Sequence, residues 1–381
     1  MISDRQVKRC VRCITPETFP GISFDEHGVC SECHEYDRRY GRWQRSPLDV
    51  GALIRKRQRK NSRFAAIVGV SGGKDSCNVL HLLVREFGVK NVLAVTHDNG
   101  FLSDGARQNI QKVVGKLGLE HRYYGANPDL CTRLYRALIE KHCSEWCLFC
   151  MAGISSGLLE IAAKERISTV VTGVSPRTEP MFPLEIMNWF DFRYLKDVVQ
   201  PHVSPSELGP FKYTSLPLAI YTAVVRRVLF INLPEYVEWD DEAIASTLER
   251  EYGWIDYGKG KPHFDCLIAP AADYFMMRRV GASKATEKLS VLVRAGRLSR
   301  EQALQEVARL KPDHVPEESV AAICSRLGVT RQVLAPYLDG TSLSYRHFKS
   351  NAALLRRFAW IFWVAYKLGF VTRLMYAKYR R

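Results

Sequence analysis

The stretch VSGGKDS at residues 70–76 follows an apolar run at residues 64–68 and precedes a stretch with helical periodicity. Its two glycines allow a tight turn, and the backbone amides of such a turn at a helix N-terminus bind anions together with the helix dipole. Lys74 adds a positive charge, and Ser71 and Ser76 add hydroxyl groups. The stretch therefore predicts a phosphate-binding loop between a strand and a helix.

The sequence around this loop alternates between short apolar runs and helical stretches. Strands are expected at 64–70, 92–96, 121–124 and 169–172, with helices at 76–87, 103–117 and across 128–164. This alternation is typical of a parallel, doubly wound α/β sheet, whose ligands bind at the carboxyl ends of the strands. Beyond residue 200 the pattern is more helical, and 218–231 is expected to form a buried helix that Arg226 and Arg227 interrupt.

The composition narrows the classes of partner. The 381 residues are 46% hydrophobic, enough for a sizeable core, and their formal net charge is +15. The last 41 residues contain nine Lys or Arg and no Asp or Glu, so much of the excess charge is C-terminal. A positive charge of this kind is typical of proteins that bind nucleic acid, acidic lipid or phosphorylated substrates. No apolar segment of a secretory signal follows Met1, so a cytoplasmic location is expected.

The N-terminal cysteines form two pairs, Cys10-x2-Cys13 and Cys30-x2-Cys33, with sixteen residues between them. Each pair places two thiolates on one side of a tetrahedron, which is the spacing of a structural zinc ribbon. The alternative is four unrelated buried cysteines. Because four ligands fill the site, we expect a structural or docking role for the Zn²⁺ and no ligand role for His34.

The central run Cys143-x3-Cys147-x2-Cys150 leaves several interpretations open. It is a candidate second metal, iron–sulfur cluster or sulfur-transfer site, for which Cys143 or Cys266 would supply a third ligand. Its spacing also fits the clusters of radical enzymes that use S-adenosylmethionine, although here it follows several helices. A second zinc site and simple buried thiols fit the same run of residues. Three further cysteines lie in helical patterns and are expected in the core: Cys77, Cys131 and Cys324.

The SGGKDS stretch resembles the loop of the PP-loop ATP pyrophosphatases, an adenine nucleotide alpha-hydrolase-like fold. It is not a Walker A loop, because Val68 stands where the first glycine of that motif belongs. The resemblance implies ATP and Mg²⁺ as cofactors, cleavage between the α and β phosphates, and Lys74 and Asp75 as catalytic residues. The implied ATP-binding residues are Ser71, Gly72, Gly73, Lys74, Asp75, Ser76, Asp98 and Gly173.

Longer segments resemble the N-acetyl sugar amidotransferases of bacterial surface-polysaccharide (O-antigen) synthesis. They run from Arg9 to Cys30, from Lys261 to Leu304, and over 327–330 and 344–350. The resemblance implies that the acetamido oxygen of a nucleotide- or lipid-linked sugar is adenylated. Ammonia from a separate glutaminase subunit would then displace AMP and leave an acetamidino group. His263 and Asp265 lie in a matching segment and are candidates to face the acceptor.

Two other functions stay open. A PP-loop RNA thiolase would adenylate a base of tRNA and transfer sulfur through Cys147 and Cys150 or through an iron–sulfur cluster. A degenerate PP-loop scaffold would only dock partners and would catalyse no reaction. The intact phosphate motif argues against this alternative.

The C-terminal tail carries the aromatic run 358–366 among basic residues. Lys367 and Arg373 interrupt it, so it does not fit a membrane span. Arg356, Lys367 and Lys378 fall on one side of a helix with 3.6 residues per turn. The tail is expected either to contact acidic lipid at the inner face of the membrane or to pack on the core of the protein.

These interpretations divide the chain into five expected parts. They are a zinc ribbon at 1–45, a basic linker helix at 46–62, the PP-loop ATP-binding α/β domain at 63–200, a helical acceptor-side region at 201–315, and a C-terminal helical region with the basic aromatic tail at 316–381.

Overall fold

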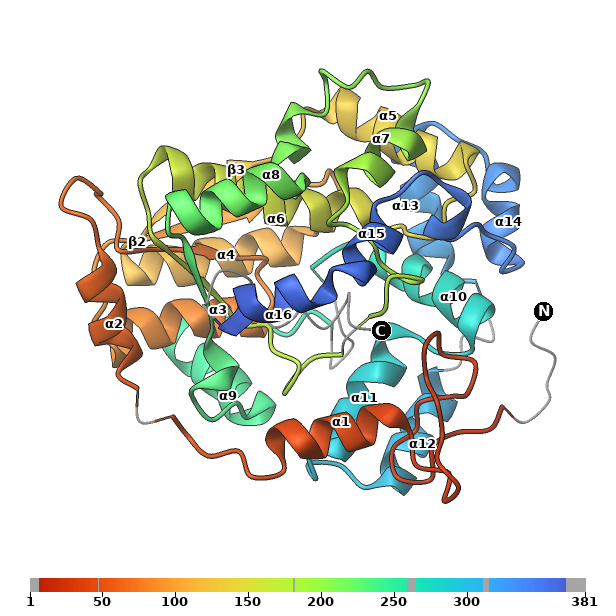
Figure 1. Cartoon of the computed structure of the whole chain (residues 1–381), viewed down its shortest axis with the longest axis horizontal. Coiled ribbons are helices and arrows are strands. Elements are labelled where there is room, and N and C mark those ends of the chain that lie inside the picture. The colour runs from red at the N-terminus through yellow and green to blue at the C-terminus, as the bar shows by residue number, and fades with distance from the viewer. Residues whose placement is uncertain (1–6, 47, 181, 259–264, 311–314, 368–381) are drawn as a thin grey trace.

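A five-stranded parallel sheet organises the first half of the protein, seen in a computed structural model that describes residues 7–46, 48–180, 182–258, 265–310 and 315–367. The strands are β1 (Ala66–Gly69), β2 (Val92–His97), β3 (Glu120–Tyr124), β4 (Thr169–Thr172) and β5 (Leu229–Asn232). Their order is β3-β2-β1-β4-β5, and each neighbouring pair is parallel (Figure 1). This order confirms the predicted doubly wound α/β fold class.

Helices cover both faces of the sheet, which explains why its central strands are apolar on both sides. On one face, Ala66 and Val68 pack in a core with residues of α2 (Val50–Arg57), α3 (Lys74–His81), α4 (Asp104–Leu117) and α9 (Asp241–Tyr252). On the other face, Ile67 packs with residues of α6 (Leu148–Lys164). The helix predicted at 76–87 is α3 extended by the π-helical turn η1 (Leu82–Glu86).

Residues 218–231 differ from the predicted buried helix. The short helix α8 (Leu216–Ile220) and the π-helical turn η3 (Tyr221–Val225) end before Arg226, and β5 then adds a strand to the sheet. Ile220 and Val225 are 51% and 63% exposed, so this helical segment lies at the surface. The prediction was wrong because Arg226 and Arg227 mark the end of the helix and not an interruption within it, and the periodicity of the short apolar run after them does not distinguish a strand from a helix.

The basic segment before the sheet contains a helix, as expected. Asp49 caps α2 by accepting a hydrogen bond from the amide of Ala52 at 2.8 Å. At the other end, the Arg57 guanidinium donates to the carbonyl of Arg227 at 2.6 Å, and Ser168 Oγ donates to the carbonyl of Arg57 at 2.6 Å. The helix is therefore anchored to the loops that precede β4 and β5.

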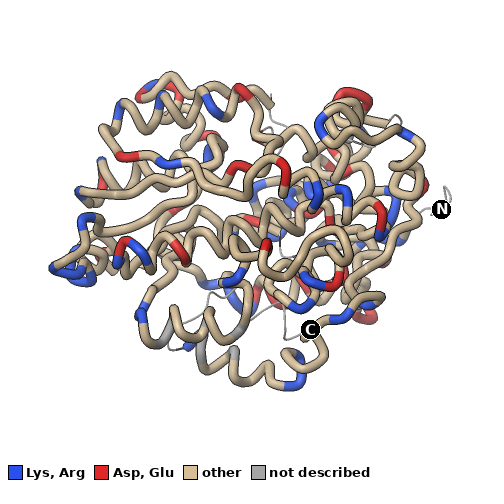
Figure 2. The backbone as a smooth tube through the Cα atoms, turned by 90° about the horizontal axis from the view of Figure 1, so that it is seen from above, with Lys and Arg blue, Asp and Glu red and all other residues tan. Residues whose placement is uncertain are grey.

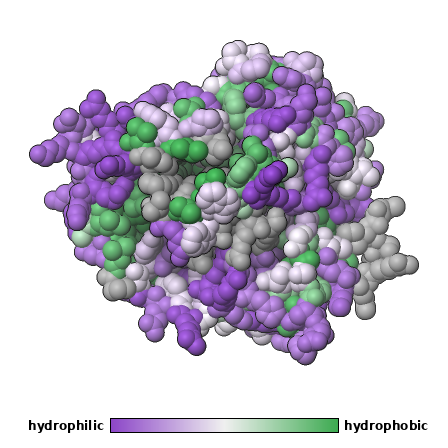
Figure 3. All heavy atoms as spheres, in the orientation of Figure 1, coloured by the Kyte–Doolittle hydropathy of each residue, from purple (hydrophilic) through white to green (hydrophobic). Residues whose placement is uncertain are grey.

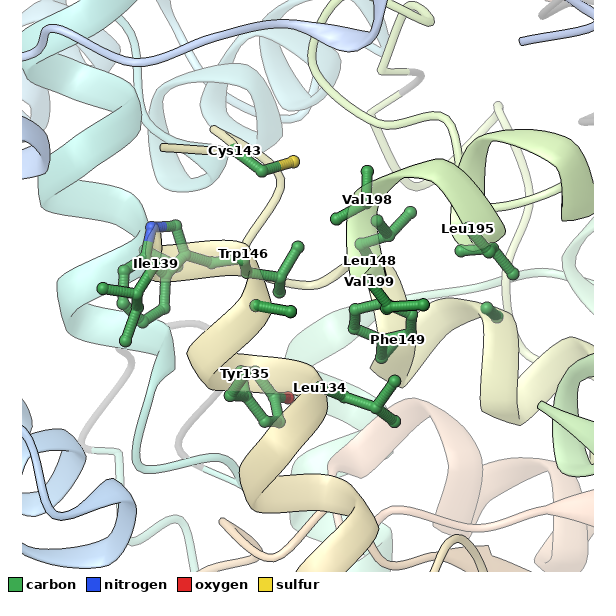
Figure 4. Close-up of a cluster of buried hydrophobic side chains, with 14 of the residues drawn as sticks. Leu134, Tyr135, Ile139, Cys143, Trp146, Leu148, Phe149, Leu195, Val198 and Val199 are labelled. Atoms are coloured by element: carbon green, nitrogen blue, oxygen red, sulfur yellow. The ribbon is translucent and has the colours of Figure 1, made fainter. Parts of the chain in front are cut away.

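A second hydrophobic core lies outside the sheet, among α5 and helices of the second half. The helices are α5 (Pro128–Glu140), α7 (Phe192–Val199), α10 (Ala269–Val280), α13 (Glu317–Leu327) and α14 (Ala335–Leu338), with the 3-10 turns η2 (Gly209–Thr214), η5 (Arg331–Leu334) and η6 (Tyr345–His347). Figure 4 shows Leu134 and Tyr135 of α5 close to Trp146 and Phe149 in this core. The 3-10 turn η4 (Leu233–Glu235) instead packs in the core on the sheet. Cys77 is buried as expected, whereas Cys131 and Cys324 are only half-buried.

The four N-terminal cysteines come together, as their spacing predicts. Their sulfur atoms all lie within 4.8 Å of one another, and all four residues are fully buried. The amides of Cys13 and Cys30 both point at the Cys10 sulfur, at 3.4 and 3.2 Å. His34 stays outside this group and contacts Asp25 Oδ2 at 2.8 Å. Four converging thiols of this kind suit a closed tetrahedral metal site.

The cysteine module packs against helices from the far end of the sequence. Ile14 packs with Ala303 and Val307 of α12 (Arg300–Leu310), and the Arg300 guanidinium donates to the carbonyls of Cys10 and Cys13 at 3.1 Å each. Its own helix, α1 (Ser31–Tyr40), lies next to α11 (Lys284–Arg294) (Figure 1). The module therefore ties the N-terminus to the helical half of the protein.

The C-terminal helices α15 (Ala352–Arg357) and α16 (Ala359–Lys367) leave much of their apolar surface uncovered. Trp360 is 65% exposed and Trp363 is 47% exposed, so these rings do not pack on the protein's own core. Figure 3 shows hydrophobic side chains on the face where α8 and α16 lie in Figure 1. In the described part of the chain, none of the helices has the length and apolar content needed to cross a bilayer. Arg373 and Lys378 lie outside the described residues.

Removing one thiol should release the metal that we expect in the cysteine module. In Cys13→Ser, bound metal measured by mass spectrometry should fall from about one ion per chain to near zero, and the melting temperature should fall by at least about 5 °C. The matched control is His34→Ala, which changes a neighbour outside the cluster. Full metal content in Cys13→Ser would contradict the site.

Candidate functional site

The phosphate loop lies where β1 ends and α3 begins. Gly73 is the extended N-cap residue of α3, and Lys74 opens the helix. Gly72 has φ +84°, and a Cβ there would lie 2.4 Å from the carbonyl oxygen of Ala106, so only glycine fits. The turn predicted from the two glycines is therefore present at the positive end of a helix dipole, which suits an anion.

The serines of the loop hold its shape. Ser76 Oγ donates to the carbonyl of Gly73 at 3.0 Å and accepts from the amide of Ser71 at 3.1 Å. The carbonyl of Gly72 points away from the loop and accepts a hydrogen bond from the indole of Trp254 at 2.9 Å. These contacts satisfy carbonyl groups within the protein, so the loop is pre-shaped before any ligand binds.

Lys74 lies between two carboxylates. Its Nζ is 2.8 Å from Asp75 Oδ1 and 2.8 Å from Asp241 Oδ1, and Trp239 Nε1 donates to the same Asp75 oxygen at 2.9 Å. Burial alone would lower the pKa of Lys74, but the charges of Asp75 and Asp241 raise it above its ordinary value. The lysine therefore stays cationic at neutral pH.

A second lysine extends this network. Lys288 of α11 donates to the carbonyl of Thr178 at 2.8 Å, forms an ion pair with Glu179, and lies 3.6 Å from Asp241 Oδ2. Burial raises the pKa of Glu179, whereas its ion pair with Lys288 acts in the opposite direction. Asp241 and Glu179 were not among the predicted residues, because neither belongs to a motif. The available signal was their position shortly after β5 and β4, at the ligand-binding edge of the sheet.

Asp98 lies at the carboxyl end of β2, beside β1, as predicted. Its Oδ2 accepts from Arg107 Nη2 at 2.9 Å, and its Oδ1 accepts from the amide of Gly100 at 2.9 Å. Burial would raise the pKa of Asp98, but these two hydrogen bonds hold it below its usual value. The carboxylate is therefore ionised and already paired, and its contact with ribose or Mg²⁺ stays a prediction.

Gly173 follows β4 and packs tightly against the phosphate loop. A Cβ at this position would lie 2.8 Å from the carbonyl oxygen of Asp75. Glycine is therefore required for the approach of β4 to the first turn of α3. The predicted contact of Gly173 with adenosine stays a prediction.

The structure does not bring Cys143 together with Cys147 and Cys150. The Cys143 sulfur lies 3.0 Å from the hydroxyl of Tyr194, in the second hydrophobic core. Across the described ranges, the N-terminal four are the only group in which at least three ligand atoms lie within 4.8 Å of one another. The predicted three-thiol site with Cys143 is therefore wrong in this geometry, because that residue turns into the core.

Cys266 is the cysteine that lies near the Cys147–Cys150 pair. Burial, and after it the thiols of Cys266 and Cys147, raise the pKa of Cys150 well above its usual range. Burial also raises the pKa of Cys266 to about 11. Lys284 Nζ donates to the Cys147 sulfur at 3.1 Å. Cys150 and Cys266 are therefore protonated at neutral pH and are poor nucleophiles unless a metal or base removes the proton.

His263 lies outside the described residues. The neighbouring Asp265 is described, and its carbonyl accepts a hydrogen bond from the amide of Ser103 at 2.9 Å. Ser103 is the N-cap residue of α4, the helix that packs against Gly72. The segment that contains Asp265 therefore meets the ATP-binding half next to the predicted nucleotide site.

Comparison with known proteins places the chain in a superfamily. Residues 255–362 match the family described as "LPS biosynthesis protein WbpG-like, C-terminal domain". The uncharacterized protein MJ1599 of Methanocaldococcus jannaschii is 22% identical over 314 residues, which are 81% of this chain and 97% of that protein. The NH3-dependent NAD+ synthetase of Chlorobaculum tepidum is 28% identical over 139 residues, which are 34% of this chain and 46% of the synthetase.

A solved structure, the U34-tRNA thiolase NcsA from Methanococcus maripaludis with its 4Fe–4S cluster, aligns with 90% of this chain and 98% of the thiolase, at 16% identity and a TM-score of 0.30. The sequence matches agree with the SGGKDS loop at the end of β1 and with the parallel strand order. Together they show that the chain belongs to the PP-loop ATP pyrophosphatase superfamily, whose members use ATP.

Proposed function

We propose that the protein is an AMP-forming amidotransferase that converts the acetamido group of an N-acetyl sugar into an acetamidino group during surface-polysaccharide synthesis. The observation that carries the proposal is one chain that combines the SGGKDS phosphate loop with a WbpG-like C-terminal domain at residues 255–362. The loop supports ATP as the activating substrate. The domain supports a saccharide as the acceptor.

In this proposal the loop amides and Lys74 bind the β and γ phosphates of ATP. The acetamido oxygen attacks the α phosphorus, and the bond from that phosphorus to the oxygen bridging to the β phosphate breaks. Lys74 and Lys288 stabilise the negative charge that develops on the departing pyrophosphate. Mg²⁺ supplies further positive charge when bound, and the carboxylates of Asp75 and Asp241 fit its preference for oxygen ligands.

The second step replaces AMP with nitrogen. Ammonia attacks the carbon of the adenylated group, the carbon–oxygen bond breaks, and AMP leaves with the bonding electrons while the nitrogen loses a proton. Activation is needed because an amide oxygen is a very poor leaving group, whereas AMP is a good one. The NH3-dependent NAD+ synthetase among the relatives supports ammonia as the nucleophile. We propose that a separate glutaminase subunit supplies it.

RNA thiolation is a second candidate, favoured by the half-buried cysteines Cys147, Cys150 and Cys266, whose thiols lie near enough to influence one another. Asn99, two residues after β2, donates to the Cys266 sulfur at 3.7 Å, so this region borders the nucleotide-binding edge of the sheet. In this case the three cysteines would hold an iron–sulfur cluster or carry the sulfur to a tRNA base. The raised pKa of Cys150 and of Cys266 means that a metal or base would have to deprotonate them first.

We also propose that α16 contacts an anionic membrane surface from the cytoplasmic side. Trp360, Ile361 and Trp363 are 65%, 46% and 47% exposed, and the exposed cations Arg357 and Lys367 flank them. Exposed tryptophans next to Lys and Arg are typical of helices that lie at the lipid headgroup level. Apart from the basic run at residues 55–60, many Lys and Arg elsewhere are interspersed with Asp and Glu (Figure 2), which favours this local contact over a broad basic face for nucleic acid.

Replacing the lysine of the phosphate loop should abolish ATP cleavage. In Lys74→Ala, the rate of AMP formation should fall by about 100-fold or more, because one positive charge against the leaving pyrophosphate is lost. The matched control is the exposed Lys90→Ala, which should keep the wild-type rate. The rate of AMP formation in Asp241→Asn should lie between those of Lys74→Ala and Lys90→Ala, because this change removes one carboxylate next to Lys74 without removing the cation. Unchanged AMP formation in Lys74→Ala would refute the assigned site.

The two candidate functions predict different effects of removing the Cys147 or Cys150 thiol on product formation. With ATP, ammonium and an acetamido sugar nucleotide, amidotransfer should give AMP and pyrophosphate, and Cys147→Ala and Cys150→Ala should each keep at least about half of that rate. Thiolation instead requires both thiols, so either change would abolish the product. Cys77→Ala is the control for loss of a buried thiol. Release of ADP and orthophosphate would rule out both functions.

Removing the exposed indoles should release the protein from lipid. In Trp360→Ser/Trp363→Ser, binding to vesicles that contain phosphatidylglycerol should weaken by at least about fivefold in a sedimentation assay. Val333→Ser, which changes an exposed apolar residue on η5, serves as the control. Equal binding of all three proteins would mean that α16 does not contact the membrane.

A further inference from the structure

A pocket of about 490 Å³ lies apart from the phosphate loop and is lined by three arginines. Arg279 comes from the last turn of α10, Arg346 from η6 and Arg356 from α15. The remaining lining residues include Glu185, which follows β4 along the chain, and Gly21 of the cysteine module. The pocket is therefore built where the helical half, the cysteine module and a loop of the ATP-binding half meet.

All three guanidinium groups converge on one glutamate. Arg346 Nη2 lies 2.8 Å and Arg356 Nη2 lies 3.1 Å from the same oxygen, Glu185 Oε1. Arg279 Nη2 donates to the backbone carbonyl of Glu185 at 2.9 Å. The Glu185 carboxylate therefore pairs with two guanidinium groups while its backbone carbonyl accepts from the third, and the lining of the pocket keeps an excess of positive charge.

This arrangement leaves donors for an anionic ligand. A guanidinium carries five N–H donors in a planar fork that matches the oxygen atoms of phosphate. The contacts to Glu185 engage one Nη2 atom of each arginine. Arg356 Nε is buried and, within the described part of the chain, has no hydrogen-bond partner. Ser344 adds a polar side chain to the same wall. The pocket is chemically suited to a phosphate group.

The loop after β4 connects this pocket with the phosphate loop. Glu179 of that loop pairs with Lys288 near Lys74, and Glu185 follows six positions later at the arginines. A second connection between the pocket and the phosphate loop runs through two consecutive helices. Arg279 lies in the last turn of α10, and Lys288 lies on the next helix, α11. One loop and one helix pair thus border both the ATP site and the pocket.

We propose that Arg279, Arg346 and Arg356 bind the phosphate or diphosphate through which the acetamido sugar is attached to its carrier. This inference rests on the proposed amidotransferase function and names the part of the substrate that the protein holds outside the reacting group. Binding the carrier phosphate in this pocket orients the sugar, so its acetamido oxygen meets the α phosphate of ATP. The carrier is a nucleotide or a polyprenyl lipid, and both present the same phosphate chemistry to arginine.

Direct binding measurements test the pocket without requiring turnover. The phosphate loop is first saturated with a non-hydrolysable ATP analogue, and the affinity for UDP-N-acetylglucosamine or for polyprenyl-diphosphate N-acetylglucosamine in detergent is then measured by calorimetry. Arg346→Gln/Arg356→Gln should weaken binding of the true carrier form by about 10- to 100-fold. Arg309→Gln, which changes an exposed arginine of α12 outside the pocket, should bind like the wild type.

A second variant separates ligand binding from a purely structural ion pair. Glu185→Gln removes the carboxylate that competes with phosphate for two of the arginines, so affinity should rise by about threefold or more. If the pair only held the fold together, this variant and the double arginine variant would weaken binding alike, with a lower melting temperature in both. That parallel loss would overturn the proposal.

Comparing the nucleotide-linked sugar with the lipid-linked sugar identifies which carrier supplies the phosphate. Loss of affinity for the nucleotide sugar alone, or for the lipid-linked sugar alone, supports the pocket and identifies its carrier. Wild-type affinity of Arg346→Gln/Arg356→Gln for both forms, or no binding of either form by the wild type, overturns it. Failure of the amidotransferase proposal would look different, since the arginine-dependent binding would persist while no acetamido sugar stimulated AMP formation.

Discussion

The ion pair network around Lys74 is the interaction on which the rest of the site depends. A buried cation is costly unless carboxylates lie against it, and Asp75 and Asp241 supply them at 2.8 Å each. Asp241 opens α9, the helix that follows β5, so the lysine joins the beginning of the sheet to its last strand. A bound triphosphate has to compete with these carboxylates for Lys74. The loop is thus charged and pre-shaped, and in the proposed reaction it would exchange protein carboxylates for the phosphate oxygens of ATP.

The cysteine module contributes to this site through α11. Arg294, in the last turn of α11, donates to Thr15 Oγ1 at 2.6 Å, and Thr15 in turn contacts Glu287 at 3.2 Å. The same helix carries Lys288, which lies 3.6 Å from Asp241. The four-cysteine cluster, which could hold a metal ion, therefore helps to fix the position of a cation near the phosphate loop.

Most of the sheet was predictable from the sequence, because β1, β2 and β4 are short apolar runs and the first four strands are separated by helical stretches. The loop was predictable because glycine alone tolerates the backbone at Gly72. β5 was not, since only Arg226, Arg227 and Val228 separate it from an apolar helix, and two charged residues do not distinguish an interrupted helix from a helix followed by a strand. Glu179 and Asp241 were missed for another reason: each joins the site through tertiary packing, and neither spacing nor residue type marks it. Cys143 is the opposite case. Its spacing from Cys147 and Cys150 in the sequence suggests a shared site, but its sulfur contacts the hydroxyl of Tyr194 instead.

The turn between α10 and α11 carries the cations of the acceptor side. Arg279 comes just before it and lines the arginine pocket, Lys284 comes just after it and contacts Cys147, and Lys288 follows one turn later beside Glu179. Because residues four apart lie on the same side of a helix, Lys284 and Lys288 face the same layer of the protein. One short helical corner therefore positions cations at the pocket, at the half-buried thiols and near the phosphate loop. A small movement of that corner would change all three contacts together.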